Sequence, residues 1–234
     1  MSATANTVGP QSFVERCSTC TLDETCGFYG HPELQHISER RFYGRHFTVT
    51  RQGDPAAKVY IVCSGWLQLT HLTPTGRIVS QIAGPDTILG LTGVMTESEY
   101  MYSARTLEES ELQQIEREAF LTFIQDNPKV SVQLLKTMSR QWQRLLQRFY
   151  ELSSKVPAEA RLLRTLREIS ETCGNPMNGG IRIRVPLSVQ VLADTVGCSR
   201  QWVSKLLGNL EEKGLIRHKS GWITVNYVGL RSRR

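Results

Sequence analysis

The segment that most constrains the fold of this chain lies near its carboxyl end, at residues 186–207. Two short helical patterns occur in it, and each begins just after a serine, Ser188 or Ser199, a residue type that favours helix N-caps. Gly197 lies between the two patterns, where glycine supplies the backbone of a sharp turn. Ala193 is small enough for the two helices to approach closely. These residues predict a helix-turn-helix.

The second helix of this motif should present polar side chains outward near its amino end. In a recognition helix, this region contacts base edges and phosphates. Residues 217–225 then read as two short strands around a turn at residues 220–221, which predicts a wing. A helix-turn-helix followed by a wing indicates binding to double-stranded DNA. The predicted DNA-contacting residues are Ser199, Arg200, Gln201, Ser204 and Lys205.

The distribution of charge supports this interpretation. Thirteen of the 28 Lys and Arg residues but only six of the 22 Asp and Glu residues lie from Val156 onward, so this part carries a net charge of +7. The remaining fifteen basic and sixteen acidic residues give residues 1–155 a net charge of −1. Counterion release draws such a basic region to a phosphate backbone, whereas no basic amphipathic anchor indicates a membrane. An ordinary solvated basic surface is the alternative interpretation.

The amino-terminal half shows strand patterns instead. Residues 47–49, 59–69, 78–82 and 112–115 are short β-rich runs, separated by turns that contain glycine and proline. Many short strands with such turns predict a β-sandwich or jelly-roll barrel.

A long helical pattern follows residues 126–128 and carries an apolar residue at alternating steps of three and four. Polar residues fill the positions between, so we expect the helix to pair with the same helix of a second copy. A helix packed only on its own domain is the alternative. Pro157 then marks a hinge to the last domain. The predicted interface residues are Leu135, Met138, Trp142, Leu145, Phe149 and Leu152.

Three cysteines near the amino terminus, Cys17, Cys20 and Cys26, follow a C-x2-C-x5-C spacing. Two residues between the first pair let both sulfurs reach one metal ion, and five more bring back a third thiolate. The start of the chain lacks the features of a signal peptide, and no run of eighteen apolar residues occurs, so we expect a cytoplasmic protein. In that reducing compartment, the cluster indicates an iron or zinc site, a redox disulfide or incidental thiols. No local motif supplies a catalytic His and acid, which predicts that the chain is not an enzyme.

These features resemble the CRP/FNR family of bacterial transcription regulators over roughly residues 13–228, above all at residues 59–65 and 197–207. The resemblance implies an α+β fold with an N-terminal β-roll (jelly-roll, cyclic-nucleotide-binding-like) sensor domain, a long dimerisation helix and a C-terminal winged helix-turn-helix. The corresponding boundaries are residues 1–126, 127–156 and 157–234. It also implies a homodimer that binds a palindromic operator and works with RNA polymerase.

The cysteine spacing resembles the FNR branch, in which three such thiolates hold an oxygen-labile [4Fe-4S] cluster. The resemblance therefore implies a regulator that senses oxygen or redox state. The fourth cysteine of that branch is absent, because residues 112–115 contain none. Cys63 is the candidate fourth ligand, since its strand should lie beside residues 112–115; a small residue packed in its strand is the alternative. Asp23 or His31 remain open as ligands.

The sequence also contains residues that would suit other sensing chemistries. A zinc or thiol–disulfide regulator responsive to redox state or nitric oxide would use the same cysteines. Haem would need one of the available histidines as an axial ligand. A cyclic nucleotide is not expected, because the Gly-Glu and Arg-Ser pairs of the family's pocket are replaced in residues 88–93 and 100–103. The histidines considered for haem are His31, His36, His46 and His71.

The predicted dimer helix differs from monomer–dimer switching members of the FNR branch at one position. Those proteins place an acidic residue where this chain has Leu145. The apolar seam predicts a dimer that persists when the cluster is lost.

Overall fold

The computed structural model describes residues 34–74, 76, 78–85, 87–153, 156–185, 187–219 and 222–228. The predicted ligands Cys17, Cys20 and Cys26 lie outside these residues, as do the side chains of Phe149 and Leu152. The chain divides into two compact units, residues 1–67 with 83–148 and residues 68–82 with 149–234. Within the described residues, no helix has the length and apolar character needed to cross a membrane.

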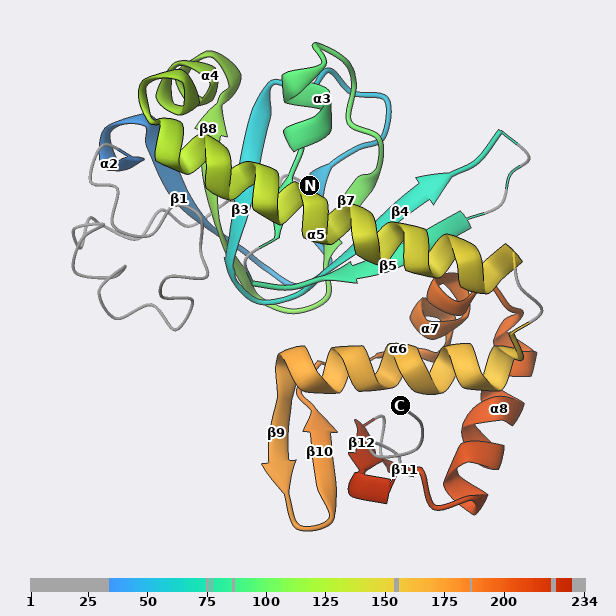
Figure 1. The fold of residues 1–234 in the computed structure, drawn as a ribbon. Coiled ribbons are helices and arrows are strands. Elements are labelled where there is room, and N and C mark those ends of the chain that lie inside the picture. Colours follow the sequence, from blue (N-terminus) through green and yellow to red (C-terminus); the bar gives the residue numbers. More distant parts are fainter. Residues whose placement is uncertain are drawn as a thin grey trace. The chain divides into compact units, whose positions relative to one another are not determined.

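Short strands dominate the first half of the chain, and two longer helices follow them (Figure 1). The strands form two four-stranded sheets, with the orders β1-β8-β3-β6 and β2-β7-β4-β5. This confirms the predicted β-sandwich. The elements are α2 (Leu34–Ile37), β1 (Ser38–Tyr43), β2 (Thr48–Thr50), β3 (Lys58–Ser64), β4 (Leu67–Leu72), β5 (Ile78–Ala83), β6 (Ile88–Leu89), α3 (Leu91–Met95), β7 (Ser103–Thr106), β8 (Ser110–Glu116), α4 (Arg117–Asp126) and α5 (Pro128–Ser153).

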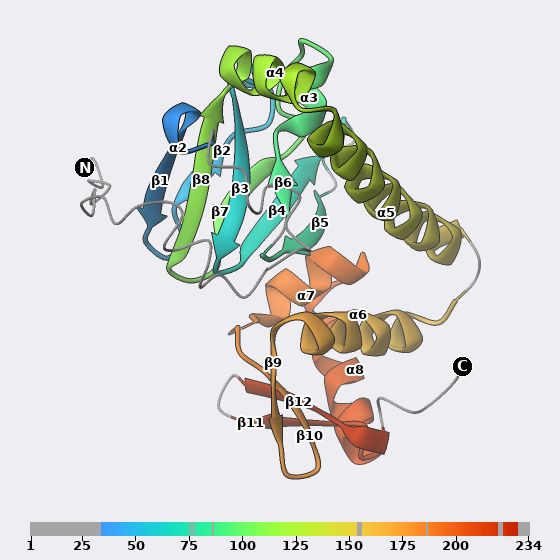
Figure 2. The same ribbon diagram turned by 60° about the vertical axis from the view of Figure 1, so that its left-hand side comes forward.

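The strand β3 forms the centre of the first sheet, where it pairs antiparallel with β8. Figure 2 shows β1, β8 and β3 side by side. Residues 59–69 had the pattern of one long strand, but the structure breaks them into β3 and β4 at Gly65. Gly65 has φ 86°, and a Cβ there would lie 2.2 Å from Ser110 Oγ. Only glycine fits this turn, so the break is built into the sequence.

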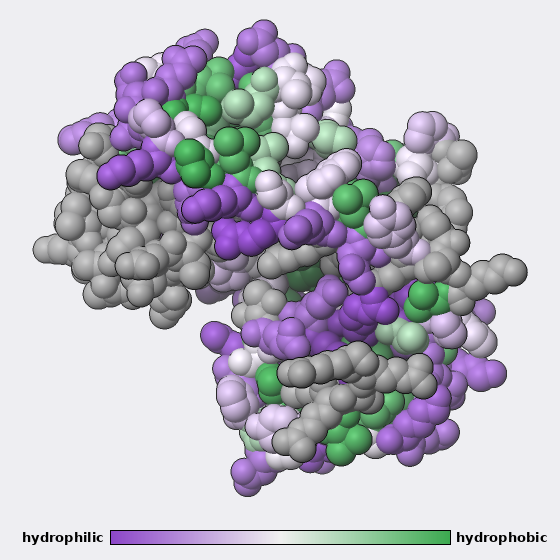
Figure 3. Space-filling view, in the orientation of Figure 1, coloured by the Kyte–Doolittle hydropathy of each residue, from purple (hydrophilic) through white to green (hydrophobic). Residues whose placement is uncertain are grey.

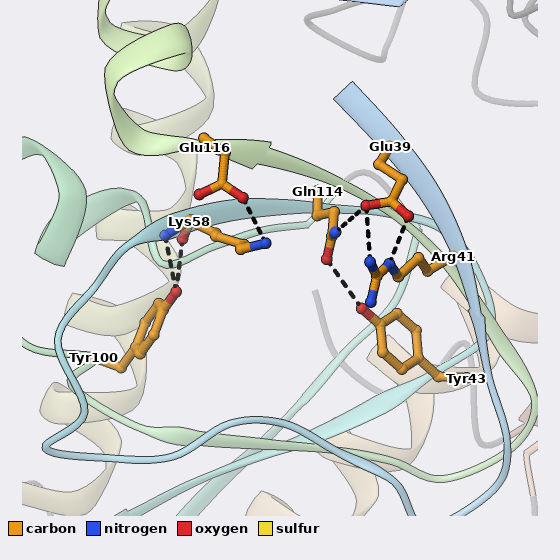
Figure 4. Close-up of polar contacts among 7 residues, drawn as sticks. All are labelled: Glu39, Arg41, Tyr43, Lys58, Tyr100, Gln114 and Glu116. Atoms are coloured by element: carbon orange, nitrogen blue, oxygen red, sulfur yellow. Dashed lines mark hydrogen bonds and ion pairs between the residues drawn. The ribbon is translucent and has the colours of Figure 1, made fainter. Parts of the chain in front are cut away.

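Polar side chains on β1, β3 and β8 form cross-strand contacts within this sheet (Figure 4). Gln114 Nε2 donates to Glu39 Oε2 at 2.7 Å, and the Tyr43 hydroxyl donates to Gln114 Oε1 at 3.4 Å. Tyr100, which lies outside the strands, donates from its hydroxyl to the carbonyl oxygen of Lys58 at 3.0 Å. These bonds satisfy the buried polar groups of Tyr43, Tyr100 and Gln114.

Burial raises the pKa of four tyrosines in this region, Tyr43, Tyr60, Tyr100 and Tyr102. In the unfolded chain a tyrosine titrates near pH ~10. Above that pH the unfolded chain releases these protons before the folded one does, so the free energy of unfolding should fall as the pH rises. Below it, this contribution is fully present.

We expect urea unfolding measured between about pH 8 and about pH 11.5 to show this alkaline loss of stability. Tyr60 is 8% exposed and has the largest upward pKa displacement of the four, so Tyr60→Phe should make the decline shallower. An identical pH dependence in the wild type and the variant would contradict the assignment.

The helix α5 carries two separate apolar stripes. The first consists of Val130 and Leu134, with Thr137 beside them, and these residues are at most 6% exposed. Figure 3 shows apolar patches next to strongly hydrophilic ones over α5. The second stripe lies roughly a quarter turn around the helix from the first. It consists of Leu135, Met138, Trp142 and Leu145, which are 63%, 38%, 59% and 53% exposed.

The last part of the chain contains the helices α6, α7 and α8 and a four-stranded sheet of order β11-β12-β10-β9. Gly174–Met177 form the edge strand β9, which pairs antiparallel with β10. Pro176 is tolerated because β9 is an edge strand, where no ladder bond is needed on the free side. The elements are α6 (Ala158–Cys173), β9 (Gly174–Met177), β10 (Gly180–Ile183), α7 (Val189–Val196), α8 (Arg200–Glu212), β11 (Ile216–Lys219) and β12 (Trp222–Asn226).

Candidate nucleic-acid interface

The helices α7 and α8 form the predicted helix-turn-helix. The Ser188 hydroxyl accepts a bond from the backbone N–H of Val191 at 3.1 Å, and Ser199 Oγ accepts one from Trp202 at 3.2 Å, so both serines are N-caps. Gly197 has φ 72° and ψ 41°, and its N–H donates to the carbonyl oxygen of Ala193. The left-handed glycine ends α7 and turns the chain into α8.

The inner face of α8 is buried in the domain core, whereas its outer face is exposed. Val203, Leu206, Leu207 and Leu210 are at most 3% exposed. This arrangement fixes the helix and leaves its polar side free for a ligand. All five predicted DNA-contacting residues are exposed, namely Ser199, Arg200, Gln201, Ser204 and Lys205.

Trp202 is an exposed aromatic residue on α8 that the sequence did not single out. It is 46% exposed, and the Lys205 ammonium lies 5.5 Å from the centre of its ring. A cation above an indole face is attracted by the ring quadrupole. The indole therefore holds Lys205 on the outer side of the helix.

The predicted wing is also present. The strands β11 and β12 pair antiparallel, with Lys219 opposite Trp222, and residues 220–221 that join them lie outside the described part. Glu211 Oε1 accepts the backbone N–H of His218 at 2.8 Å, which ties β11 to one flank of α8. The wing therefore lies against the recognition helix.

Arg161 connects the hinge segment to the turn of the motif. Its Nη1 donates to the carbonyl oxygen of Val156 at 2.8 Å, and its Nη2 donates to that of Val196 at 3.4 Å. Nη2 also lies 3.6 Å from Cys198 Sγ. The 35 residues between Arg161 and Val196 explain why no local pattern indicated this contact. Arg161 orients the helix-turn-helix relative to the segment that enters the domain.

The strand that carries Cys63 pairs with residues 112–115 of β8, as predicted, and Cys63 itself lies just beyond this paired stretch. The β3–β8 register shifts between Val62 and Ser64, which places Cys63 in a β-bulge beside Glu111. The bulge leaves Cys63 half-buried, with its Sγ 3.8 Å from the carbonyl oxygen of Ile61. Among the described residues, no three His, Cys, Asp or Glu side chains gather as a metal site.

The segment that would bind a cyclic nucleotide has an apolar character. Gly90 is followed by Leu91, which is 6% exposed, and Ser103 is preceded by Tyr102. Neither residue offers the carboxylate or the guanidinium that the family's ribose and phosphate contacts need. That cyclic nucleotides do not bind to this chain stays a prediction.

Comparison with known proteins places the chain among bacterial regulators. Residues 40–127 match the cyclic nucleotide-binding domain, and residues 160–233 match the Crp-like helix-turn-helix domain. The cyclic AMP receptor protein of Thermus thermophilus is 30% identical over 200 residues, which cover 82% of this chain and 86% of that protein. The anaerobic regulatory protein of Bacillus subtilis is 29% identical over 185 residues, covering 78% and 77%.

A solved structure supports the same assignment. The c-di-GMP-responsive regulator CLP of Xanthomonas campestris matches with a TM-score of 0.70 and 25% identity, over 82% of this chain and 95% of that one. The relatives are transcription regulators and not enzymes. With two matched domains in the order seen in the structure, the chain belongs to the CRP/FNR family of DNA-binding transcription regulators.

Proposed function

We propose that this regulator is a cytoplasmic homodimer that binds a palindromic operator, works with RNA polymerase and senses oxygen or redox state through an iron–sulfur cluster, [4Fe-4S]. The observation that carries the DNA-binding part is the exposed polar face of α8 above a fully buried inner face. We keep residues 1–126, 127–156 and 157–234 as its sensor, dimerisation and DNA-binding segments.

The exposed stripe on α5 supports the homodimer. A helix that packed only on its own unit would have one apolar stripe, but α5 buries Val130 and Leu134 and still exposes Leu135, Trp142 and Leu145. A soluble helix exposes such a row when a partner covers it. A second copy of the same helix has the matching row, and a two-fold axis allows both to pair.

Two dimer-related recognition helices set the geometry of the operator. Half-sites should lie about one helical turn apart, ~34–36 Å between centres. Gln201 can make a bidentate contact with adenine, whereas Lys205 can bind a phosphate. The two contacts can be distinguished by measurement, because only the Gln201 contact depends on the base sequence of the DNA.

We expect selection from a random duplex library to enrich a palindrome. On this palindrome, Gln201→Ala should lose ~1–3 kcal/mol of binding free energy at one base pair. Lys205→Met should weaken binding to every duplex and should reduce the slope of log affinity against log salt concentration by about one. Binding can be followed by fluorescence anisotropy at several salt concentrations. Equal losses on all duplexes for both variants would contradict these two roles.

The cysteine segment supports the sensing part of the proposal, together with the similarity to an anaerobic regulatory protein. Seven residues separate Cys26 from Leu34, a stretch that can reach about 26 Å. The helix α2 contacts β1, and β1 lies two strands from β3. From Ser38, Cys63 is roughly 10 Å across the sheet and about 13 Å along it. A thiolate at this bulge is therefore within reach of the segment.

The four sulfurs form a donor set that suits iron–sulfur chemistry. Cys17, Cys20 and Cys26 would hold three iron atoms, and Cys63 would hold the fourth. When bound, the cluster would supply an oxygen-labile crosslink between the amino-terminal segment and β3. The chain's own contribution is to position these thiolates and to pass the constraint through α5 to the helix-turn-helix.

A further inference from the structure

Gly208 lies in the interior of α8, and the packing of the residues that the structure describes does not require a glycine there. Glycine is among the least favourable residues at such a position. A Cβ added at Gly208 would meet no atom of the described residues within 4 Å, whereas at Gly174 and Gly180 it would lie 2.0 and 2.3 Å from neighbouring atoms. Its backbone is also not in the left-handed region. Nothing in the described part of the protein therefore calls for glycine at this position.

The position of Gly208 on the helix indicates what approaches it. Gly208 follows Lys205 by three residues and Gln201 by seven, so these three positions lie along one line of the helix. Val203 and Leu210 lie on the opposite, buried side. Gly208 thus continues the face that we assign to DNA.

The charges along α8 limit how far this face extends. Arg200 and Lys205 make the first half of the helix basic, whereas Glu211 and Glu212 make its end acidic. A phosphate backbone is attracted to the first pair and repelled by the second. Gly208 is the last residue on the outer face before the acidic pair, where the DNA and the helix must part.

We propose that Gly208 is a point of close approach between the backbone of α8 and the sugar–phosphate backbone of DNA, in space that any side chain would fill. This inference rests on the proposed DNA-binding function. It assigns to Gly208 a contribution to affinity that is independent of base sequence. It also means that stability and affinity are opposed at this residue, because alanine would favour the helix and obstruct the DNA.

Gly208→Ala and Gly208→Leu test the proposal through two measurements. Without DNA, both variants should unfold about 2–4 °C above the wild type, because both residues are better helix formers than glycine. Affinity for the duplex enriched by selection should fall about tenfold for alanine and about a hundredfold for leucine. A scrambled duplex of the same composition should show the same relative losses.

Two control variants define the result. Gly44→Ala also places a methyl group in open space with an ordinary backbone, but in the other unit, so its affinity should not change. Gln201→Ala should lose affinity only for the selected duplex. Unchanged binding by Gly208→Leu, losses confined to the selected duplex, or a lowered unfolding temperature would each overturn the proposal. If the wild type enriches no duplex at all, the proposed function itself fails.

Discussion

Leu145→Asp is expected to convert the dimer into a monomer. Leu145 is 53% exposed at the carboxyl end of the second stripe of α5, which we propose pairs with the same stripe of a second copy. The substitution removes two apolar side chains from the seam and forces two carboxylates out of water. The dimer dissociation constant should rise about a thousandfold, which corresponds to roughly 4 kcal/mol.

Loss of the dimer should also reduce affinity for a palindromic operator by about a hundredfold or more, because a monomer engages one half-site and loses the linked second contact. Analytical ultracentrifugation and anisotropy give the two readouts. Gln143→Asp is the matched control, since it adds the same carboxylate to an exposed site off the stripe. A monomeric wild type, or a Leu145→Asp variant that remains dimeric, would show that this stripe is not the interface.

The apolar seam also determines what happens after cluster loss. With no acidic residue at Leu145, nothing in the described stripe drives the two helices apart. The apo protein should therefore remain a dimer, with altered affinity for DNA. Apo protein that elutes at the position of a monomer in size-exclusion chromatography would refute this expectation.

Replacing any one of Cys17, Cys20 or Cys26 with serine is expected to remove the iron. A serine hydroxyl is a poor substitute for a cysteine thiolate as a ligand of an iron–sulfur cluster. With only two thiolates left in the amino-terminal segment, the cluster should not stay bound. We expect iron below about a tenth of the wild-type content and operator affinity reduced about tenfold or more. Cys63→Ser should give the same loss if Cys63 is the fourth ligand.

Cys173→Ser provides the matched control for these variants. Cys173 is buried at the end of α6, and its Sγ donates to the carbonyl oxygen of Ile169 at 3.0 Å, a bond that serine can keep. Its iron content should equal that of the wild type. Wild-type iron content in Cys63→Ser would show that the fourth ligand is another residue, and Asp23 and His31 would be replaced next. Wild-type iron content in Cys20→Ser would reject the proposed thiolate site.

The sequence predicted the helix-turn-helix best, because its boundaries depend on local chemistry. Ser188, Gly197 and Ser199 specify caps and a turn within a few residues, and the structure has each of them in its expected role. The strands were harder to predict. Residues 38–43 carry four polar side chains, so β1 lacks an alternating pattern and is stabilised by its pairing with β8.

The contacts of the candidate site that depend on distant residues were not predictable. The bulge at Cys63 arises from the register between β3 and β8, which no single strand specifies. The bonds from Arg161 to the turn of the motif join residues on different helices. The exposure of Trp202 depends on which face of α8 is buried, since Val203 beside it is fully covered.

The most direct test of the central claim is to measure iron content and operator affinity on one anaerobically purified sample, before and after exposure to air. The account predicts about four iron atoms per chain, a broad absorbance band near ~400 nm that bleaches in air, and a parallel loss of operator affinity. A colourless protein, a sharp Soret band, or an affinity that air leaves unchanged would contradict iron–sulfur control of DNA binding.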